Sequence, residues 1–428
     1  MEKLMHYVWL HRLFPAERLK TVDGKRLEII SPGTYNTDSG PDFFNATIAI
    51  DGQTWAGNVE IHIKASDWYN HHHDRDKAYD SVILHVVDTD NTKVKRRDGT
   101  VIPQFRMPCS PHLNSYYLNL TERAPAELPC ASTIKTIPQL YVTDWLSALA
   151  YERVQQKADR IEQERQYADG SWEEAAYMTI ARSLGSGKNS DQMERLARLC
   201  PLRILRKQAD SLTATEAILF GQSGLLPQSN DQSTYAGQLF SEYSFYAAKY
   251  GLSPMDSAAW RMGRMRPLSL PYRRIALLAA LIARRGALLD SILEVRNFER
   301  AAKLFSIELS PFWNTHYTFT TPTENLPPVL GRNAIELMMI NAVIPLKYAF
   351  AVYNGRYEQS TEAVEMLHRI KAESNSIVEL FSQAGLRGKS AFTSQALIQL
   401  RRQYCEPRKC LYCRIGHRYL AGCALRPS

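Results

Sequence analysis

Residues 39–64 constrain the fold of this chain more strongly than any other stretch of its sequence. A Gly-Pro-Asp turn at 40–42 leads into an apolar segment at 43–50, and the dipeptide Asp51-Gly52 follows. Asp-Gly between two apolar segments is typical of a two-residue β-hairpin turn. The sequence therefore predicts two antiparallel strands joined at residues 51 and 52.

The second strand of this hairpin alternates between apolar and polar residues. Positions 59, 61 and 63 are apolar and fall on one face, and the polar face carries Asn58, Glu60, His62 and Lys64. Apolar strands are expected before and after this strand in the chain. We therefore expect the polar row to line a cleft within the fold, where chemistry should be sought.

The first 110 residues predict an α/β domain. The expected elements, in chain order, are a helix at 3–14, a strand at 27–30, the hairpin at 43–64, a short helix or loop at 74–80, and strands at 81–87 and 102–107. Residues 81–87 are almost continuously apolar, which is typical of a strand buried on both faces. The order is thus helix, strand, strand, strand, short helix, strand.

The composition changes after this domain. Residues 121–139 contain three prolines without periodicity, and helical patterns then recur from 145 to 403. At roughly 150 residues per domain, a chain of 428 residues has room for two or three domains. We predict an α/β domain at 1–120, a linker at 121–139, a mostly α-helical domain at 140–400 and a basic, cysteine-rich tail at 401–428.

The order of the N-terminal elements, with Pro41-Asp42 before one strand and Glu60-x-His62 on the next, resembles the PD-(D/E)xK nuclease superfamily. The resemblance implies a restriction-endonuclease-like mixed sheet in which Asp42 and Glu60 bind magnesium. It covers about the first 110 residues. The chain as a whole resembles a bacterial family of unknown function marked by Ser-Gly-Pro-Asp-Phe at 39–43 and Val-Glu-Ile-His at 59–62.

This sequence departs from the superfamily at its lysine, which orients or activates the attacking water. His62 stands at that position, and Lys64 follows two residues later on the same face. The ordinary pKa of histidine lies near neutral pH, so His62 is a candidate base, and Lys64 is a candidate contact to the scissile phosphate. Without a replacement for the lysine, the nuclease would be altered or inactive.

The residues predict a metal site independently of this resemblance. Two carboxylates that converge from adjacent strands repel each other and favour a hard divalent cation such as magnesium. A metal-activated water beside a base would then attack a phosphodiester. The alternative is that Asp42 only caps the turn and Glu60 faces solvent. Glu28 and Asp38 are two further acids that could join the site.

Histidines form a second candidate site. His71, His72 and His73 follow Trp68-Tyr69-Asn70 in a predicted turn, and His85 lies in an apolar strand. Imidazoles at this density, together with His62, can bind zinc or another transition metal. The alternatives are a hydrogen-bonded core histidine at 85, and a supporting or phosphate-contacting role for His73 or His85 beside the carboxylates.

An arginine-rich segment suggests an anionic partner. Seven arginines and no acidic residue occur between 261 and 285, and the net charge of the chain is +8. Arg261, Arg264 and Arg266 lie in a predicted loop, and Arg273 and Arg274 open the next predicted helix. Exposed arginines bind phosphates through paired hydrogen bonds, so the cluster predicts contact with nucleic acid. A solvated face paired with acids elsewhere is the alternative.

The tail carries four of the seven cysteines. Cys405, Cys410 and Cys413 form a Cys-x4-Cys-x2-Cys pattern, and His417 or Cys423 is available as a fourth ligand. Closely spaced cysteines can chelate one metal, so the tail predicts structural zinc, an iron–sulfur cluster or free thiols. Neighbouring basic residues would favour the thiolate form.

The chain does not open with a basic start and a long apolar run, and its longest apolar helical stretch, expected at 275–283, is far shorter than the ~20 residues that cross a bilayer. We expect a cytoplasmic protein without a membrane partner. The favoured function is magnesium-dependent hydrolysis of phosphodiesters in DNA or RNA. The alternatives are a non-catalytic nucleic-acid-binding or scaffold protein that keeps the fold, and a hydrolase of another substrate that uses the histidine cluster.

Overall fold

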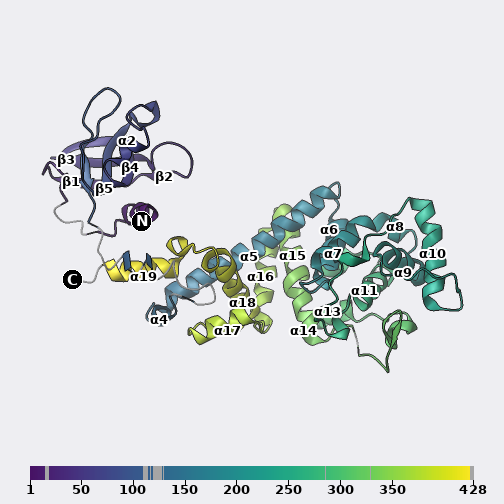
Figure 1. Cartoon of the computed structure of the whole chain (residues 1–428). Helices are drawn as coiled ribbons and strands as arrows, with labels where there is room; N and C mark the ends of the chain where they lie inside the picture. Colours follow the sequence, from purple (N-terminus) through teal and green to yellow (C-terminus); the bar gives the residue numbers. More distant parts are fainter. Residues whose placement is uncertain are drawn as a thin grey trace. The chain divides into compact units, whose positions relative to one another are not determined.

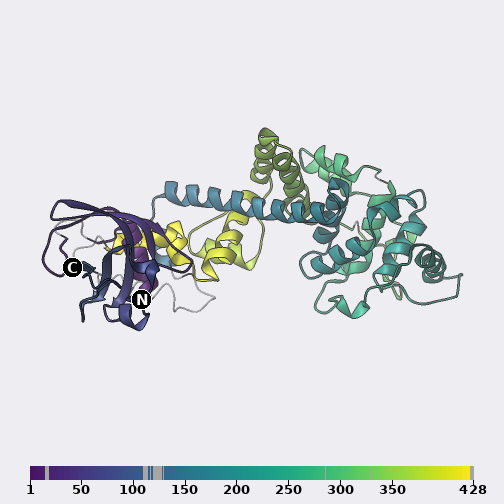
Figure 2. The same cartoon turned by 90° about the horizontal axis from the view of Figure 1, so that it is seen from above.

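The computed structural model describes residues 1–14, 19–108, 114, 115, 117, 118, 128, 130–284, 286–327 and 329–424, with the backbone alone at 133 and 422–424. The chain forms two compact units, and Figure 1 labels most of their elements, which Figure 2 shows from above. The sheet unit comprises Met1–Trp145, Ser376–Arg387 and Leu400–Ser428, and the helical unit comprises Leu146–Asn375 and Gly388–Gln399. In this division the predicted tail is grouped with the N-terminal sheet.

The sheet unit is built on a mixed sheet. Its strands are β1 (Leu27–Ser31), β2 (Thr34–Tyr35), β3 (Phe43–Ile50), β4 (Gln53–Lys64), β5 (Val82–Thr89) and β6 (Gln104–Arg106). They lie in the order β1-β3-β4-β5-β6, with β2 also paired to β3. Neighbours from β1 to β4 are antiparallel, whereas β4, β5 and β6 run parallel. The prediction of an N-terminal mixed α/β region is confirmed.

The central hairpin forms at the predicted residues. Ile50 pairs with Gln53, and the two residues between them, Asp51 and Gly52, have positive φ angles of 48° and 85°. Two such residues in succession make the turn whose twist matches that of antiparallel strands. The first strand, β3, has the predicted bounds.

A crossover joins the parallel strands β4 and β5. Residues 65–81 make this connection with a short helix, α2 (Asp67–Asn70), and a 3-10 turn, Lys77–Tyr79. Gly57 allows the two strands to approach closely, because a Cβ there would lie 2.5 Å from the Ile83 side chain and 2.6 Å from the Ser81 carbonyl. The crossover carries the consecutive histidines of the sequence back over β4.

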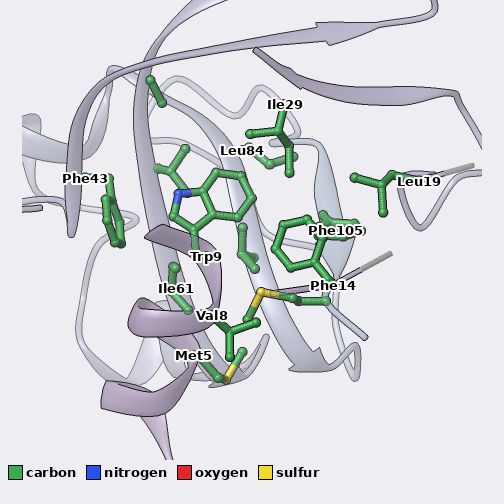
Figure 3. Packing of buried hydrophobic residues seen from close by; sticks show 14 of the residues in the cluster. Met5, Val8, Trp9, Phe14, Leu19, Ile29, Phe43, Ile61, Leu84 and Phe105 are labelled. Carbon is green, nitrogen blue, oxygen red and sulfur yellow. The ribbon is translucent and has the colours of Figure 1, made fainter. Parts of the chain in front are cut away.

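Helix α1 (Glu2–His11) covers one face of the sheet. Its residues Leu4, Met5, Val8 and Trp9 are completely buried. Figure 3 shows the Trp9 ring within a cluster that includes Phe43, Ile61, Leu84 and Phe105. A smaller hydrophobic cluster contains two residues from the crossover and three from β5 and the chain that follows it, namely Trp68, Tyr79, Val82, Val94 and Ile102.

The predicted helical character beyond the sheet is also confirmed. The sheet unit contains α4 (Ala131–Ile134), α17 (Ser376–Gln383) and α19 (Arg414–Ala424), a π turn at Arg401–Cys405 and a 3-10 turn at Cys410–Tyr412. Helix α5 (Gln139–Tyr167) belongs to this unit up to Trp145 and to the helical unit from Leu146.

The helical unit contains these described elements: α6 (Trp172–Leu184), α7 (Ser190–Leu199), α8 (Leu202–Arg206), α9 (Leu212–Gln222), α10 (Tyr235–Tyr250), α11 (Pro271–Arg284), α12 (Leu288–Leu293), α13 (Phe298–Phe305), α14 (Arg332–Met338), α15 (Ile344–Tyr353), α16 (Tyr357–Arg369) and α18 (Ala391–Leu400). Short 3-10 turns lie at Ser257–Ala259, Pro267–Ser269 and Pro311–Asn314. A two-stranded hairpin is formed by β7 (His316–Thr318) and β8 (Thr321–Pro322).

Part of the predicted linker, at 121–127 and 129, lies outside the described residues. Of its other residues, Ala131–Ile134 form α4, and α5 begins at Gln139 although the pattern predicted helix only from 145. Pro138 precedes this start, where its missing N–H and fixed φ cost the helix nothing.

One helical stretch is longer and more apolar than the sequence predicted. Arg332–Tyr353 runs through α14, a π turn at Met339–Val343 and α15, whereas we expected the longest apolar stretch at 275–283. By length and composition alone it could cross a membrane. However, 67% of its most apolar window is buried inside the protein, as in the core helix of a soluble protein.

Candidate metal centre

Asp42 and Glu60 are held together by two reciprocal hydrogen bonds. The backbone N–H of Asp42 donates to Glu60 Oε2 (3.0 Å), and the backbone N–H of Ile61 donates to Asp42 Oδ2 (2.9 Å). Asp42 immediately precedes β3, and strand pairing sets Phe43 opposite Val59, next to Glu60. The two acids expected to converge are therefore neighbours, and Glu60 is buried, with only 5% of its surface exposed.

Two imidazoles lie near the second oxygen of Glu60, and a third lies beside one of them. Glu60 Oε1 lies 3.3 Å from Nε2 of His73 and 3.5 Å from Nε2 of His62. His62 Nε2 in turn lies 3.1 Å from Nδ1 of His71. His62 comes from β4, and the other two come from the crossover. The fold thus merges two sequence-predicted clusters, the carboxylates and the histidines, into one site.

These separations match those of ligands around a single ion. Imidazole nitrogens and carboxylate oxygens bind zinc at about 2.0–2.2 Å, so tetrahedral geometry sets neighbouring ligand atoms roughly 3.3–3.6 Å apart. The two distances from Glu60, 3.3 and 3.5 Å, fall in this range, whereas the His62–His71 separation of 3.1 Å is slightly shorter and has hydrogen-bond geometry. His62, His71 and His73 each also offer a ligand atom within 4.8 Å of the other two.

The geometry around His73 points the same way. Its Nε2 makes no hydrogen bond to any described residue, although it lies 3.3 Å from Glu60 Oε1. A nitrogen and an oxygen that approach closely without hydrogen-bond geometry are expected where both bind the same cation. The ring of His73 is fixed by stacking on Tyr79, with the centroids 3.7 Å apart.

His85 orients His62. The Nδ1 of His62 lies 2.9 Å from Nε2 of His85, which stands on the neighbouring strand, opposite Glu60. If Nε2 of His62 binds an ion, its proton resides on Nδ1 and is donated to His85. Metal-ligating histidines usually donate their other N–H in this way. His85 is completely buried, so the acceptor is held in place.

Burial sets the protonation of the site. Burial, and then the Asp42 carboxylate, raise the pKa of Glu60 to about 9. Burial, and then the other imidazoles, lower the pKa of His62 to about 2, and burial likewise lowers that of His85 to about 3. The His62–Glu60 approach is therefore not an ion pair at neutral pH. Neutral imidazoles are competent ligands, and a bound cation would favour the ionised form of Glu60.

A second group of possible ligands includes Asp42. Glu2 and His6 of α1 each place a ligand atom within 4.8 Å of the other and of an Asp42 oxygen. His6 Nε2 is 3.2 Å from Asp42 Oδ2, again without a hydrogen bond to any described residue. The sequence did not predict these residues. Their i, i+4 spacing puts them on one helix face, but nothing local shows that this face meets Asp42.

The other polar residues proposed for the site lie apart from it. Lys64 is exposed at the end of β4, and Asn58 is half-buried and donates to the Ser81 hydroxyl (2.8 Å). Glu28 and Asp38 are exposed. The polar row of β4 is therefore enclosed only at its two central members.

The predicted arginine cluster is divided by the fold. Arg261, Arg264 and Arg266 are exposed in the loop before α11. Arg273 and Arg274 are instead buried, with 3% and 8% of their surface exposed, because almost the whole first three turns of α11 lie inside the helical unit. Arg273 donates to the Pro327 carbonyl (2.8 Å). The expectation that these two guanidinium groups are exposed for phosphate contact is corrected.

The proposed ligands in the tail differ in their burial and in their contacts. Cys405 and Cys410 are half-buried, Cys413 is buried, and none of the described cysteines forms a disulfide. His417 is engaged elsewhere, with its Nδ1 2.6 Å from the Tyr7 hydroxyl and its ring against Tyr7 and His11. The side chain of Cys423, the other proposed fourth ligand, lies outside the described residues.

The protein thus combines a mixed-sheet unit that holds a buried acid–histidine site with a helical unit. Residues 2–376 match the family described as "Protein of unknown function (DUF2851)", and the chain belongs to this family. No curated protein and no solved structure matches the chain. The expected resemblance to a family of unknown function is thereby confirmed, while the likeness to nucleases stays a prediction.

Proposed function

We propose that this protein is a metal-dependent hydrolase that cleaves phosphodiester bonds in nucleic acid. The observation that carries the proposal is a group of three imidazoles whose ligand atoms lie within 4.8 Å of one another, two of them 3.3 and 3.5 Å from a buried carboxylate that adjoins a second one. Perturbed, buried titratable groups with a shared geometry are typical of functional sites. Ordinary core packing does not require four ligand-type side chains to meet in this way.

Three features support nucleic acid as the substrate. The strand order, with Asp42 entering β3 and Glu60 on β4, agrees with the resemblance to PD-(D/E)xK nucleases. The net charge of +8 favours an anionic partner. Arg261, Arg264 and Arg266 remain exposed and available to phosphates.

The donor set fits a transition-metal ion better than the magnesium that the resemblance implies. Magnesium takes oxygen ligands in octahedral geometry, whereas imidazoles suit zinc, iron or nickel. One oxygen of Glu60 already accepts a backbone N–H, and the other lies among imidazoles. We therefore assign no step to magnesium at the histidine group.

The residues divide the work as follows. Glu60, His62, His71 and His73 would hold the ion, which supplies a water of lowered pKa and a positive charge for the phosphate. His62 acts as a ligand in this proposal and not as the base, since its lowered pKa makes the buried imidazole a weak proton acceptor.

Three neighbours complete the proposed mechanism. Asp42 is less buried than Glu60 and is available to position the water or to accept its proton. His85 holds His62 in the binding tautomer. Lys64, exposed on the same strand, is available to a phosphate of the substrate.

The test is cleavage by the full chain loaded with zinc, manganese or magnesium. Substrates are single- and double-stranded DNA, RNA, and a chromogenic phosphodiester. We expect cleavage with a transition-metal ion, abolished in His73→Ala. His72→Ala is the matched control, because His72 lies in the same turn but is exposed and outside the ligand group. Absence of cleavage with every ion and substrate would reject the proposal.

The three-histidine ligand set also favours a second candidate, a hydrolase of another substrate, because such a site fixes the chemistry more than the substrate. Cleavage of small esters but not of nucleic acids would support it. Salt-sensitive DNA binding without cleavage would instead support the non-catalytic alternative. A cytoplasmic location stays a prediction.

A further inference from the structure

Three cysteines of the tail are brought together by consecutive tight turns. Cys405 ends the π turn at Arg401–Cys405, and Cys410 opens the 3-10 turn at Cys410–Tyr412. Two backbone hydrogen bonds fold this segment on itself, from Lys409 N–H to the Tyr404 carbonyl (2.8 Å) and from Cys413 N–H to the Cys410 carbonyl (3.2 Å). The turns keep all three thiols within one short loop of the sheet unit.

A fourth cysteine joins them from a distant part of the sequence. Cys130 directly precedes α4 and accepts the Ile134 N–H through its carbonyl (3.0 Å). Cys130 and Cys410 both pack against the hydrophobic cluster that contains Tyr419 and Leu420 of α19. The fold therefore brings Cys130 to the same hydrophobic cluster as the loop at 405–413, which no sequence pattern indicated.

The four thiols are electrostatic neighbours. Burial, and then the thiols of Cys413 and Cys410, raise the pKa of Cys130 to about 12. Burial also raises the pKa of Cys405, with contributions from Cys130, Cys413 and Cys410. A metal ion is the partner that stabilises a group of neighbouring thiolates.

The start of α19 provides donors for one of these sulfurs. The backbone N–H groups of Ile415 and Gly416 bond to the Cys413 sulfur, which favours its thiolate. Gly416 is required for this approach, because a Cβ there would lie 2.1 Å from the Cys410 carbonyl oxygen. N–H groups directed at a ligating sulfur stabilise metal–thiolate centres.

We propose that Cys130, Cys405, Cys410 and Cys413 are the four ligands of one metal centre, and that this centre is an iron–sulfur cluster. Four thiolates at 2.3 Å from a single zinc ion would stand roughly 3.8 Å apart. No three sulfurs among the described cysteines lie within 4.8 Å of one another. A cluster is wider than one ion, so its ligating sulfurs stand farther apart than those around zinc. The centre is separate from the histidine site and does not depend on the proposed hydrolase activity.

Metal analysis of the full chain, purified without oxygen, tests the proposal. We expect iron and acid-labile sulfide in equal amounts and a broad visible absorption band. His73→Ala should retain both, which separates this centre from the histidine site. Zinc at one ion per chain that is lost on changing these cysteines would overturn the cluster, and the absence of bound metal in the His73→Ala protein would overturn the site.

Single substitutions identify the ligands. Cys130→Ser, Cys405→Ser, Cys410→Ser and Cys413→Ser should each lose the visible band, whereas His417→Gln and Cys423→Ser should keep it. Cys200→Ser is the matched control, because Cys200 is fully buried in the helical unit. Full retention of the band in Cys130→Ser would refute the four-cysteine assignment.

A measurement on the unmodified protein tests the same assignment if the variants fail to fold. Alkylation followed by mass spectrometry should leave residues 130, 405, 410 and 413 unlabelled until a chelator removes the metal. Labelling of these four cysteines should then rise together, while that of Cys200 stays unchanged. Equal labelling before and after chelation would contradict the proposal.

Discussion

The two units bury their acidic side chains among different neighbours. In the helical unit, Glu194 contacts the guanidinium groups of Arg160, Arg182 and Arg198 at 2.6–2.9 Å. Burial acts to raise its pKa, but the arginines outweigh burial and lower it. In the sheet unit, the polar neighbours of Glu60 among the described residues are backbone N–H, neutral imidazoles and another acid, and its pKa rises to about 9.

This difference separates a structural acid from a ligand. The arginines around Glu194 supply the positive charge that makes its burial favourable, so that group is complete within the protein. The groups around Glu60 offer lone pairs instead, so an ionised Glu60 needs a cation from outside the chain. Glu60 and Glu194 are equally buried, but only Glu60 lacks a positive charge beside it among the described residues. The same substitution at both positions can therefore distinguish a ligand from a structural acid.

The largest effect is expected for Glu60→Gln. Loss of a metal ligand should abolish stoichiometric metal at the histidine site and lower cleavage by more than the ~10–100-fold that an outer-shell partner costs. The metal-free protein should lose no stability, because the change removes a buried carboxylate that lacks a cation. Bound metal and cleavage rate are the measurements, and a Glu60→Gln protein with normal metal content would contradict the ligand assignment.

Glu216 offers a pH test in the helical unit. It is fully buried, accepts hydrogen bonds from Tyr235 and Ser310, and has a pKa raised to about 7 by burial. Between pH 4.5 and 7 the folded state holds a proton that the unfolded state has lost, so stability should fall with rising pH by roughly 3 kcal/mol.

Hydrogen exchange of α9 peptides measures this slope, which should flatten above pH 7 and largely disappear in Glu216→Gln. The same slope in the variant and in the unmodified protein would show that Glu216 is not its source.

Glu194→Gln is the counterpart of Glu60→Gln. It leaves three arginines without their shared carboxylate, and we expect a loss of about 2 kcal/mol, moderated because these arginines are partly exposed. Metal content and cleavage should not change. Hydrogen exchange in α7 is the measurement, and unchanged protection there would argue against the compensating role of the arginines.

A smaller effect is expected for His85→Leu, which removes the acceptor of the His62 N–H but keeps the volume filled. The affinity for zinc should fall ~10–100-fold, as for other outer-shell partners. His85→Gln, which can still accept a hydrogen bond, should recover part of the loss. Equal affinities in both variants would assign His85 a packing role only.

The smallest effect is expected for Lys64→Ala. An exposed charge contributes at most ~1 kcal/mol, so KM for nucleic acid should rise roughly two- to fivefold at low salt while kcat stays the same. The difference should shrink as salt screens the charge. A large fall in kcat would instead place Lys64 at the reacting phosphate.

Local sequence patterns predicted those parts of the site that depend only on residues adjacent in the sequence. Asp51-Gly52 determines its own turn, and strand alternation sets Glu60 and His62 on one face, so both were predictable. The partners of that face were not. His6 reaches Asp42 only because α1 packs against the sheet, and residues 71–73 reach β4 only because the crossover returns over it.

The arginine prediction shows the same limit in the helical unit. A helical pattern gives the residues that share a face, but not how much of the helix the neighbouring elements cover. Arg273 and Arg274 lie in a helix that is buried almost all round, so two charged residues became interior ones. Burial of this extent arises from packing between segments far apart in sequence.

The sheet unit is made of three separate segments, and the whole helical unit is synthesised between the first and the last of them. Ribosomes add about 5–20 residues per second, so Cys130 leaves the ribosome on the order of tens of seconds before Cys405. During that interval the N-terminal sheet lacks its final segment and exposes the hydrophobic surface that Tyr419 and Leu420 later cover. Newly made chains are therefore expected to need protection from aggregation throughout this interval.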